Sequence, residues 1–189
     1  MEFQFDVTPT LETERLRLRR IGAADLDDWM AVWRSPGVLD YLIDFEGAPH
    51  EDVGREIIDW AERIFAEGSG IRWALALRTK GRMIGSCGFH LYDRHHQRVE
   101  IGYELHSQYW RQGLMTEAVN AVLEFCFETL AVHRVEADVV EGNAASAALL
   151  KKAGFTLEGV WRDRVYKRDA WQSLWQFGIL KPEYDALRR

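Results

Sequence analysis

Hydrophobic and polar residues alternate along the chain with two different periods, one typical of strands and one typical of helices. Leucine and arginine alternate over residues 15–19, a period of two that predicts a half-buried strand. Apolar residues then recur at helical spacing from Leu26 to Trp33, which predicts a helix that ends before Pro36. The same spacing between His50 and Glu67 predicts a second helix, closed by the glycines that follow it.

The rest of the chain adds a series of short strands and two further helices. The predicted helices carry the apolar stripe from Val119 to Leu130 and the run from Asn143 to Ala153, and the predicted strands cover residues 73–78, 83–91, 99–105, 134–139, 156–166 and 171–179. The order is therefore β-α-α-β-β-β-α-β-α-β-β. Mixed alternation of this kind indicates an α/β protein with a central mixed sheet.

Length and composition indicate one compact domain. With 189 residues, 47% of them hydrophobic and 29% charged, the chain is long enough to bury a core and lacks the composition of a disordered protein. No purely apolar stretch is longer than that from Trp73 to Leu77, which is far shorter than the roughly 20 residues that span a bilayer. No basic segment leads into an apolar one at the N-terminus, so we expect no signal peptide and predict a cytoplasmic location.

Charge and cysteine content exclude other classes of function. A net charge of −6 argues against a nucleic-acid partner, because that affinity comes mainly from Lys and Arg that neutralise phosphates. Cys87 and Cys126 cannot form a disulfide framework, and we predict two buried thiols. His90, His95 and His96 share no metal-ligand spacing with cysteines or carboxylates, so we expect a turn at the histidine pair and no metal.

Candidate chemistry gathers first at the junction between the strand that ends at Leu105 and the next helix. The connecting loop contains Arg111 and Gly113, and the helix N-terminus exposes unpaired backbone N–H groups that are suited to holding a phosphate. The alternative is a plain turn in which Gly113 supplies a left-handed backbone and Thr116 caps the helix. The chain contains neither G-x-x-x-x-G-K-[ST] nor G-x-G-x-x-G, which excludes the nucleotide triphosphatase and dinucleotide-binding signatures.

A second segment makes a family resemblance visible. It reads Asn143-x-x-Ser146, then Lys-Ala-Gly-Phe ending at Phe155, then Glu158-Gly159. Together with Ile101-Gly102-Tyr103 in the 99–105 strand and the Tyr-Trp loop before Gly113, this run resembles the GNAT acetyltransferases over nearly the whole chain. It is most similar to the RimJ/RimL-type branch, which acetylates protein N-termini and related amines.

The resemblance implies a fold, a co-substrate and a set of binding residues. It implies one GNAT-like domain over residues 1–189, α/β (α+β), with a mixed, mostly antiparallel sheet flanked by helices. The implied co-substrate is acetyl-CoA, with its pantetheine arm along the backbone of Tyr103 to Leu105 and near Asn143 and Ser146. An extended arm that ends in a diphosphate fits an open sheet edge next to a helix N-terminus. The backbone amides that would surround the diphosphate are those of Arg111, Gln112, Gly113, Leu114, Met115 and Thr116.

Three positions depart from the general GNAT pattern. Trp110 stands at the first position of the loop and Met115 stands where a small residue is usual, although both changes also occur in the RimJ/RimL-type branch. Leu150 occupies the position at which many members place a tyrosine general acid. Ser146 is then the best remaining hydroxyl to protonate or hydrogen-bond the leaving thiolate, unless it is an ordinary helix serine.

A base is also needed, because only a neutral amine attacks a thioester. Glu100 and Glu104 are predicted on one face of their strand, and either could take the proton directly or through water. Glu104 is the preferred candidate because it lies nearer the loop, and the alternative for both is a solvated strand face. The resemblance also places the loop from Pro36 to Pro49 at the acceptor groove, where Asp40, Asp44 and Glu46 could attract a cationic amine.

These observations predict an enzyme that transfers acetyl from acetyl-CoA to a primary amine by direct attack, aided by a backbone N–H of the 99–105 strand. The leading acceptor is a protein or peptide N-terminal α-amine. The alternatives are a small amine (an amino acid, a polyamine or a drug), a CoA-binding sensor without catalysis, and a structural domain with no affinity for CoA. We expect no nucleic-acid or membrane partner, and a monomer or a homodimer.

Overall fold

The computed structural model describes residues 3–43 and 49–188. Its described residues form one eight-stranded mixed sheet in the order β1-β2-β3-β4-β5-β6-β8-β7. The strands are β1 (Leu11–Glu12), β2 (Leu16–Arg20), β3 (Ile71–Leu77), β4 (Met83–Asp93), β5 (Arg98–Leu105), β6 (Arg134–Val140), β7 (Thr156–Lys167) and β8 (Ala170–Leu180). The helices are α1 (Leu26–Arg34), α2 (Glu51–Ala66), α3 (Leu114–Glu124), α4 (Ala144–Lys152) and α5 (Lys181–Leu187). The predicted α/β fold with a mostly antiparallel mixed sheet is confirmed.

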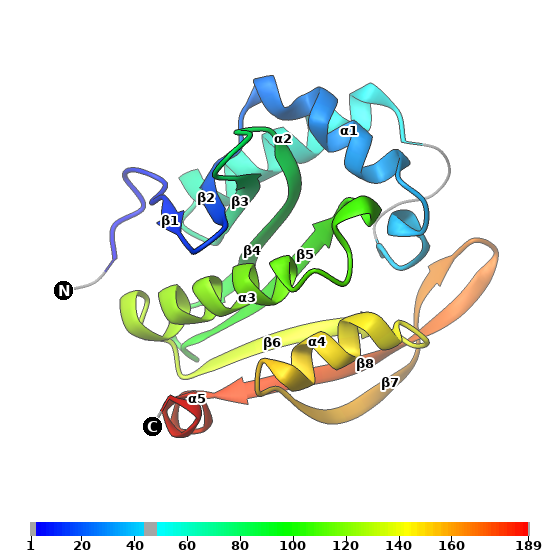
Figure 1. The fold of residues 1–189 in the computed structure, drawn as a ribbon. Coiled ribbons are helices and arrows are strands. Elements are labelled where there is room, and N and C mark those ends of the chain that lie inside the picture. The colour runs from blue at the N-terminus through cyan, green and yellow to red at the C-terminus, as the bar shows by residue number, and fades with distance from the viewer. Residues whose placement is uncertain (1–2, 44–48, 189) are drawn as a thin grey trace.

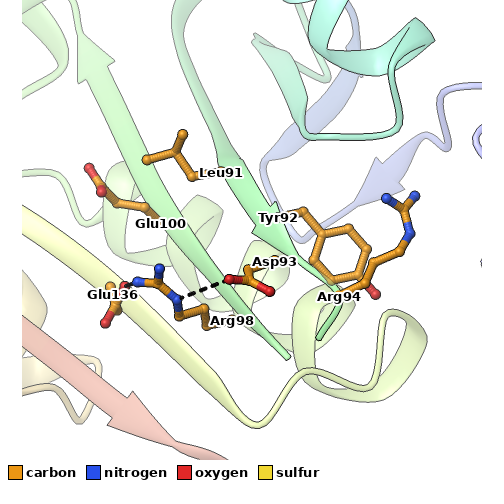
Figure 2. Close-up of a pocket in the computed structure, with 7 residues that line it drawn as sticks. All are labelled: Leu91, Tyr92, Asp93, Arg94, Arg98, Glu100 and Glu136. Atoms are coloured by element: carbon orange, nitrogen blue, oxygen red, sulfur yellow. Dashed lines mark hydrogen bonds and ion pairs between the residues drawn. The ribbon is translucent and has the colours of Figure 1, made fainter. Parts of the chain in front are cut away.

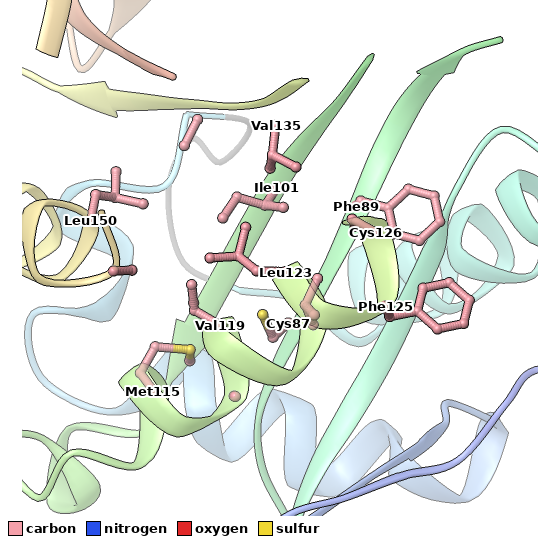
Figure 3. Packing of buried hydrophobic residues seen from close by; sticks show 14 of the residues in the cluster. Cys87, Phe89, Ile101, Met115, Val119, Leu123, Phe125, Cys126, Val135 and Leu150 are labelled. Carbon is pink, nitrogen blue, oxygen red and sulfur yellow. The ribbon is translucent and has the colours of Figure 1, made fainter. Parts of the chain in front are cut away.

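The helices cover both faces of the sheet, and each face has its own hydrophobic cluster (Figure 1). The larger cluster packs α3, α4 and α5 against the strands, and Figure 3 shows Val119 and Leu123 of α3 facing Cys87 and Ile101. The smaller cluster joins α1 and α2 to the opposite face. Side chains alternate across a strand, which is why neighbouring residues such as Trp73 and Ala74 belong to different clusters.

The sheet parts at its one described parallel pair of strands. β5 and β6 are paired only from Arg98 with Arg134 to Glu100 with Glu136. Beyond this point β5 stays paired with β4 as far as Leu105, and β6 stays paired with β8 as far as Val140. The two strands therefore present facing edges whose backbone groups have no partner across the gap. This opening in the middle of the sheet positions the site described below.

The structure differs from the sequence prediction at some element ends. α3 begins at Leu114, with Gly113 rather than Thr116 at the N-cap, and a π-helical turn over Phe125–Thr129 extends it. α5 was not predicted, because it is too short for helical spacing to be recognised in the sequence. Both cysteines are buried, as predicted. No helix within residues 3–43 and 49–188 is long and apolar enough to cross a membrane.

Candidate active site

A cavity of about 1420 Å³ occupies the opening between β5 and β6. Its floor comes from the diverging ends of these strands, and one end reaches the loop before α3 and the first residues of α4. The other walls come from α1, α2 and the segment after α1, so the cavity reaches both faces of the sheet. Elements far apart in the sequence thus meet in one groove.

The loop before α3 has an unusual backbone that exposes the amides of the helix. Arg111 and Gly113 both adopt left-handed conformations, with φ of 60° and 77°. Gly113 is the N-cap and makes no side-chain capping hydrogen bond, so the N–H groups of Leu114, Met115 and Thr116 are left for another acceptor. The side chains of Leu114 and Met115 are buried, and these two residues can offer only their backbone to the cavity.

Arg15, in the turn between β1 and β2, and Glu117 of α3 fix this loop. The Arg15 guanidinium donates to the Gln112 carbonyl at 2.9 Å and to the Glu117 carboxylate at 2.7 Å, and Thr13 donates to the same carboxylate at 2.5 Å. Burial opposes ionisation of Glu117, but the hydrogen bonds from Thr13 and Arg15 keep its pKa below the usual value. Sequence reasoning missed Arg15, because the contact joins residues about a hundred positions apart.

The loop also folds back onto the end of β5. The indole N–H of Trp110 donates to the Leu105 carbonyl at 2.7 Å, and the side-chain amide of Gln112 donates to the Gln108 carbonyl at 2.9 Å. The Leu105 carbonyl, predicted to pair with a pantetheine arm, therefore already holds one hydrogen bond. Trp110 supplies a rigid link between the strand end and the loop.

The start of α4 brings Asn143 and Ser146 to the cavity, next to Tyr103. The Asn143 side chain accepts a hydrogen bond from the Ser146 N–H at 3.1 Å and so caps the helix. The Ser146 hydroxyl lies 2.7 Å from the phenol oxygen of Tyr103 on β5. Burial raises the pKa of Tyr103 well above its usual range, and the Ser146 hydrogen bond offsets only part of that shift. The phenol therefore keeps its proton at neutral pH. Leu150 is fully buried in the larger cluster.

Glu104 lies in a buried ionic network rather than on a solvated face. Its carboxylate pairs with Arg72 on β3 and accepts a hydrogen bond from the Ser86 hydroxyl at 2.5 Å. Only 7% of the Glu104 side chain and 9% of the Arg72 side chain are exposed. A carboxylate whose oxygens already hold a guanidinium and a hydroxyl is poorly placed to accept a proton from a substrate.

Glu100 has more open surroundings on the same face of β5. It lies opposite His90 of β4, whose Nε2 is 3.5 Å from the Glu100 carboxylate, and about a quarter of each side chain is exposed. Asp138 of β6 lies close enough to interact, and burial followed by the Glu100 charge raises the pKa of Asp138. The same period-two pattern that singled out Glu100 could have found Asp138.

A second, smaller pocket of about 530 Å³ meets Glu100 at the paired end of β5 (Figure 2). Arg98 lies in it between Asp93 and Glu136, at 3.7 Å and 2.9 Å. Glu100 lines both this pocket and the large cavity. Glu100 therefore has open space beside it in both pockets.

The segment after α1 forms a wall of the cavity and is tied to the β7–β8 hairpin. Buried Lys167, at the end of β7, donates to the carbonyls of Leu39, Asp40 and Leu42 at 2.7, 3.2 and 2.5 Å. Arg168 pairs with the Asp40 carboxylate at 3.0 Å. Of the acidic residues predicted at the acceptor groove, Asp40 is thus engaged in an ion pair, and Asp44 and Glu46 lie outside the described residues.

The remaining candidates have structural surroundings. His95 and His96 lie in a turn, as predicted, and the part of the chain that the structure describes has no group of three or more His, Cys, Asp or Glu that could hold a metal. Trp29 and Trp33 pack in the smaller cluster, as predicted, and also border the cavity. No metal-dependent chemistry is assigned to these residues.

Comparison with known proteins assigns the family. The model of the acetyltransferase (GNAT) domain matches residues 15–156, about three quarters of the chain. The chain belongs to the GNAT acetyltransferase family. It is therefore an acyl-CoA-dependent N-acetyltransferase, which sets aside the non-catalytic sensor and the structural domain.

Individual GNAT relatives match over almost their full length. The uncharacterized N-acetyltransferase YoaA of Bacillus subtilis is 34% identical over 92% of this chain and 98% of its own. The RimL ribosomal L7/L12 alpha-N-protein acetyltransferase, solved with coenzyme A, has a TM-score of 0.82, 16% identity and coverage of 91% and 98%. Spermidine N-acetyltransferase from Vibrio cholerae, solved with CoA and spermine, has a TM-score of 0.78, 19% identity and coverage of 91% and 99%. These two structures show the shared fold.

Proposed function

We propose that this GNAT enzyme acetylates the N-terminal α-amine of a protein or peptide, by direct attack of the amine on acetyl-CoA. The observation that carries the proposal is Glu100, which lies beside the open edge of β5 with His90 as its neighbour. An α-amine has a pKa near 7.7–8.0, so roughly a tenth of it is neutral at pH 7, whereas a lysine amine near 10.4 is almost wholly protonated. A single carboxylate base is therefore better able to supply the neutral form of an α-amine than that of a lysine amine.

The chain's own backbone supplies the proposed acetyl-CoA site. Acetyl-CoA brings the thioester whose acetyl group is transferred. The exposed amides of Leu114, Met115 and Thr116, with those of residues 111–113, fit the diphosphate, because a helix N-terminus favours negative charge. The unpaired edge of β5 from Tyr103 towards Leu105 fits the amides of an extended arm, and one of its N–H groups can polarise the thioester carbonyl.

Glu100 is the proposed general base, and Glu104 is proposed to hold Arg72 in place. Both carboxylates face the cavity side on which α1 and α2 pack, but only Glu100 combines partial exposure with access to a second pocket. Asp138 adds negative charge next to Glu100. This charge favours entry of an ammonium group before it loses its proton.

Ser146 and Tyr103 are the proposed hydrogen-bond donors to the leaving thiolate, in place of the tyrosine that Leu150 replaces. We expect Ser146→Ala to lower kcat by about 10- to 100-fold, because a hydrogen bond to a charged group contributes about 1.5–3 kcal/mol. Tyr103→Phe should lower kcat similarly, and the double variant should be little worse than either single one, since the pair acts as a unit. Steady-state kinetics with CoA affinity measured in parallel checks this. Unchanged kcat in Ser146→Ala would contradict the role.

An acceptor screen tests the proposed function. We expect CoA thiol release from acetyl-CoA with short peptides that have a free N-terminus, and none with the same peptides after N-terminal blocking. Lysine-containing peptides with a blocked N-terminus, spermidine and free amino acids form the comparison arms. Thiol release with spermidine but with no peptide that has a free N-terminus would assign a polyamine acceptor instead. If none of the amines tested gives thiol release, all these acceptors are rejected.

A further inference from the structure

Arg72 of β3 is a buried cation beside the site of acetyl transfer. Its Nε donates to the Ser86 hydroxyl at 2.7 Å, and its Nη2 pairs with the Glu104 carboxylate. These two contacts fix the plane of the guanidinium, because its donors form a rigid fork. Arg72 also lines the large cavity, so part of this fixed group faces the space that a substrate would enter.

The third nitrogen of the guanidinium, Nη1, lies over Gly102 of β5. A Cβ atom added to Gly102 would be 2.9 Å from Nη1, closer than ordinary contacts allow. Gly102 pairs across the sheet with Gly88, so two glycines leave the strand backbone bare beneath the guanidinium. Gly102 is also the second residue after Glu100, where β5 has already parted from β6. Nη1 therefore lies next to the open edge of β5.

Nη1 carries two N–H groups that make no hydrogen bond to any residue within 3–43 or 49–188. The Glu104 carboxylate neutralises the charge of Arg72, but it uses only Nη2. Nη1 is not fully buried, so these N–H groups face the open space of the cavity, and a guanidinium can only donate hydrogen bonds. An oxygen atom of a molecule in the cavity can therefore accept a hydrogen bond from Nη1.

We propose that Nη1 of Arg72 binds a carbonyl or carboxylate oxygen of the acceptor, close to the amine that receives the acetyl group. The inference rests on the proposed function and names the residue that recognises its substrates as α-aminoacyl compounds, in which the carbonyl carbon is attached to the carbon that bears the amine. Glu100 lies two residues from Gly102 on the same face of β5, so the base and the oxygen donor are spaced along one strand. A polyamine has no oxygen that could accept a hydrogen bond from Nη1.

Two small amines, one with and one without a carbonyl next to the carbon that bears the amine, test whether the site recognises that oxygen. Alaninamide carries the carbonyl, and isopropylamine is the same branched amine without it. In wild-type protein we expect kcat/KM, corrected for the neutral fraction of each amine, to be at least about 20-fold higher for alaninamide. Alanine and a tri-alanine peptide then distinguish a free carboxylate from a peptide carbonyl as the source of the oxygen.

Arg72→Lys keeps the charge opposite Glu104 but removes the fork. It should lower kcat/KM by about 20-fold for alaninamide and by less than about threefold for isopropylamine, with the KM for acetyl-CoA unchanged. If Arg72→Lys fails to fold, the uncharged double variant Arg72→Gln with Glu104→Gln replaces it. Equal losses for both amines, or equal wild-type rates, would overturn the proposal.

Binding measurements separate this inference from the proposed function. Calorimetry with CoA-loaded protein should detect binding of alaninamide and much weaker binding of isopropylamine, whether or not acetyl transfer occurs. Binding of alaninamide that depends on Arg72, in a protein that releases no thiol with any amine, would uphold the oxygen site and reject the acetyl transfer. Thiol release whose preference among acceptors is the same in wild type and Arg72→Lys would uphold acetyl transfer and reject the oxygen site.

Discussion

Gly113→Val is expected to weaken coenzyme A binding by at least about 100-fold while the protein stays folded. This factor corresponds to the loss of two charge-assisted hydrogen bonds. Gly113 has a φ of 77°, and a β-branched residue cannot hold this conformation without strain. A Cβ at Gly113 would lie 3.5 Å from Arg15, so the obstacle is the backbone conformation and not a lack of space. When the loop relaxes, the amides of Leu114 to Thr116 no longer converge on one point. Calorimetry with CoA measures the effect.

Gly81→Val is the matched control for this prediction. Gly81 has a φ of 71°, its Cβ would meet nothing within 4 Å, and it lies in the exposed turn between β3 and β4. Both variants should lose similar stability, about 1–2 kcal/mol for a left-handed residue, but Gly81→Val should bind CoA as the wild type does. Wild-type CoA affinity in folded Gly113→Val would reject the proposed diphosphate site.

Glu100→Gln is expected to lower kcat for a peptide α-amine by about 100-fold at pH 7, the usual size of a general-base contribution. The amide keeps the shape of the carboxylate but cannot accept a proton. Because the neutral fraction of an α-amine with a pKa near 7.7–8.0 rises from roughly a tenth at pH 7 to nearly all at pH 9, the kcat of the variant should rise by up to about 10-fold between these pH values. Rates measured from pH 6.5 to 9 check both parts of the prediction.

Glu56→Gln provides the comparison for the loss of one negative charge. Glu56 belongs to α2 and lines the same cavity from the opposite wall, so its removal changes the field without touching the β5 edge. It should change kcat by less than about threefold at every pH. A Glu100→Gln variant that keeps wild-type kcat at pH 7 would exclude Glu100, and Asp138→Asn would then be the next variant to measure.

Most of the sheet and the two long segments of the site could be predicted from local patterns. The period of two in β5 predicted that Glu100 and Glu104 share a face, and the structure has them on one face. The positions of Gly113, Asn143 and Ser146 along the chain likewise placed them at the starts of helices, where the structure has them. Each of these features depends on residues fewer than about ten positions apart.

The different surroundings of Glu100 and Glu104 could not be predicted in this way. The sequence favoured Glu104 because it is nearer the loop, but its surroundings depend on Arg72, which lies 32 positions away and becomes a neighbour only through β4. Arg15 at the loop before α3 and Lys167 at the wall formed by the segment after α1 were missed for the same reason. Ion pairs between distant residues leave no periodic signal.

The sequence by itself determined the order of strands and helices apart from the short β1 and α5, many of the residues that face the core, and the loop and helix starts that mark this chain as a GNAT acetyltransferase. Local backbone preference and the burial of apolar side chains act over short stretches of chain, so the sequence carries them directly. Only the tertiary structure decided which carboxylate is held by an arginine, which one is more exposed, and which guanidinium nitrogen makes no hydrogen bond within residues 3–43 and 49–188. These properties depend on desolvation and on hydrogen bonds across strands, and both exist only once the sheet has formed and parted between β5 and β6.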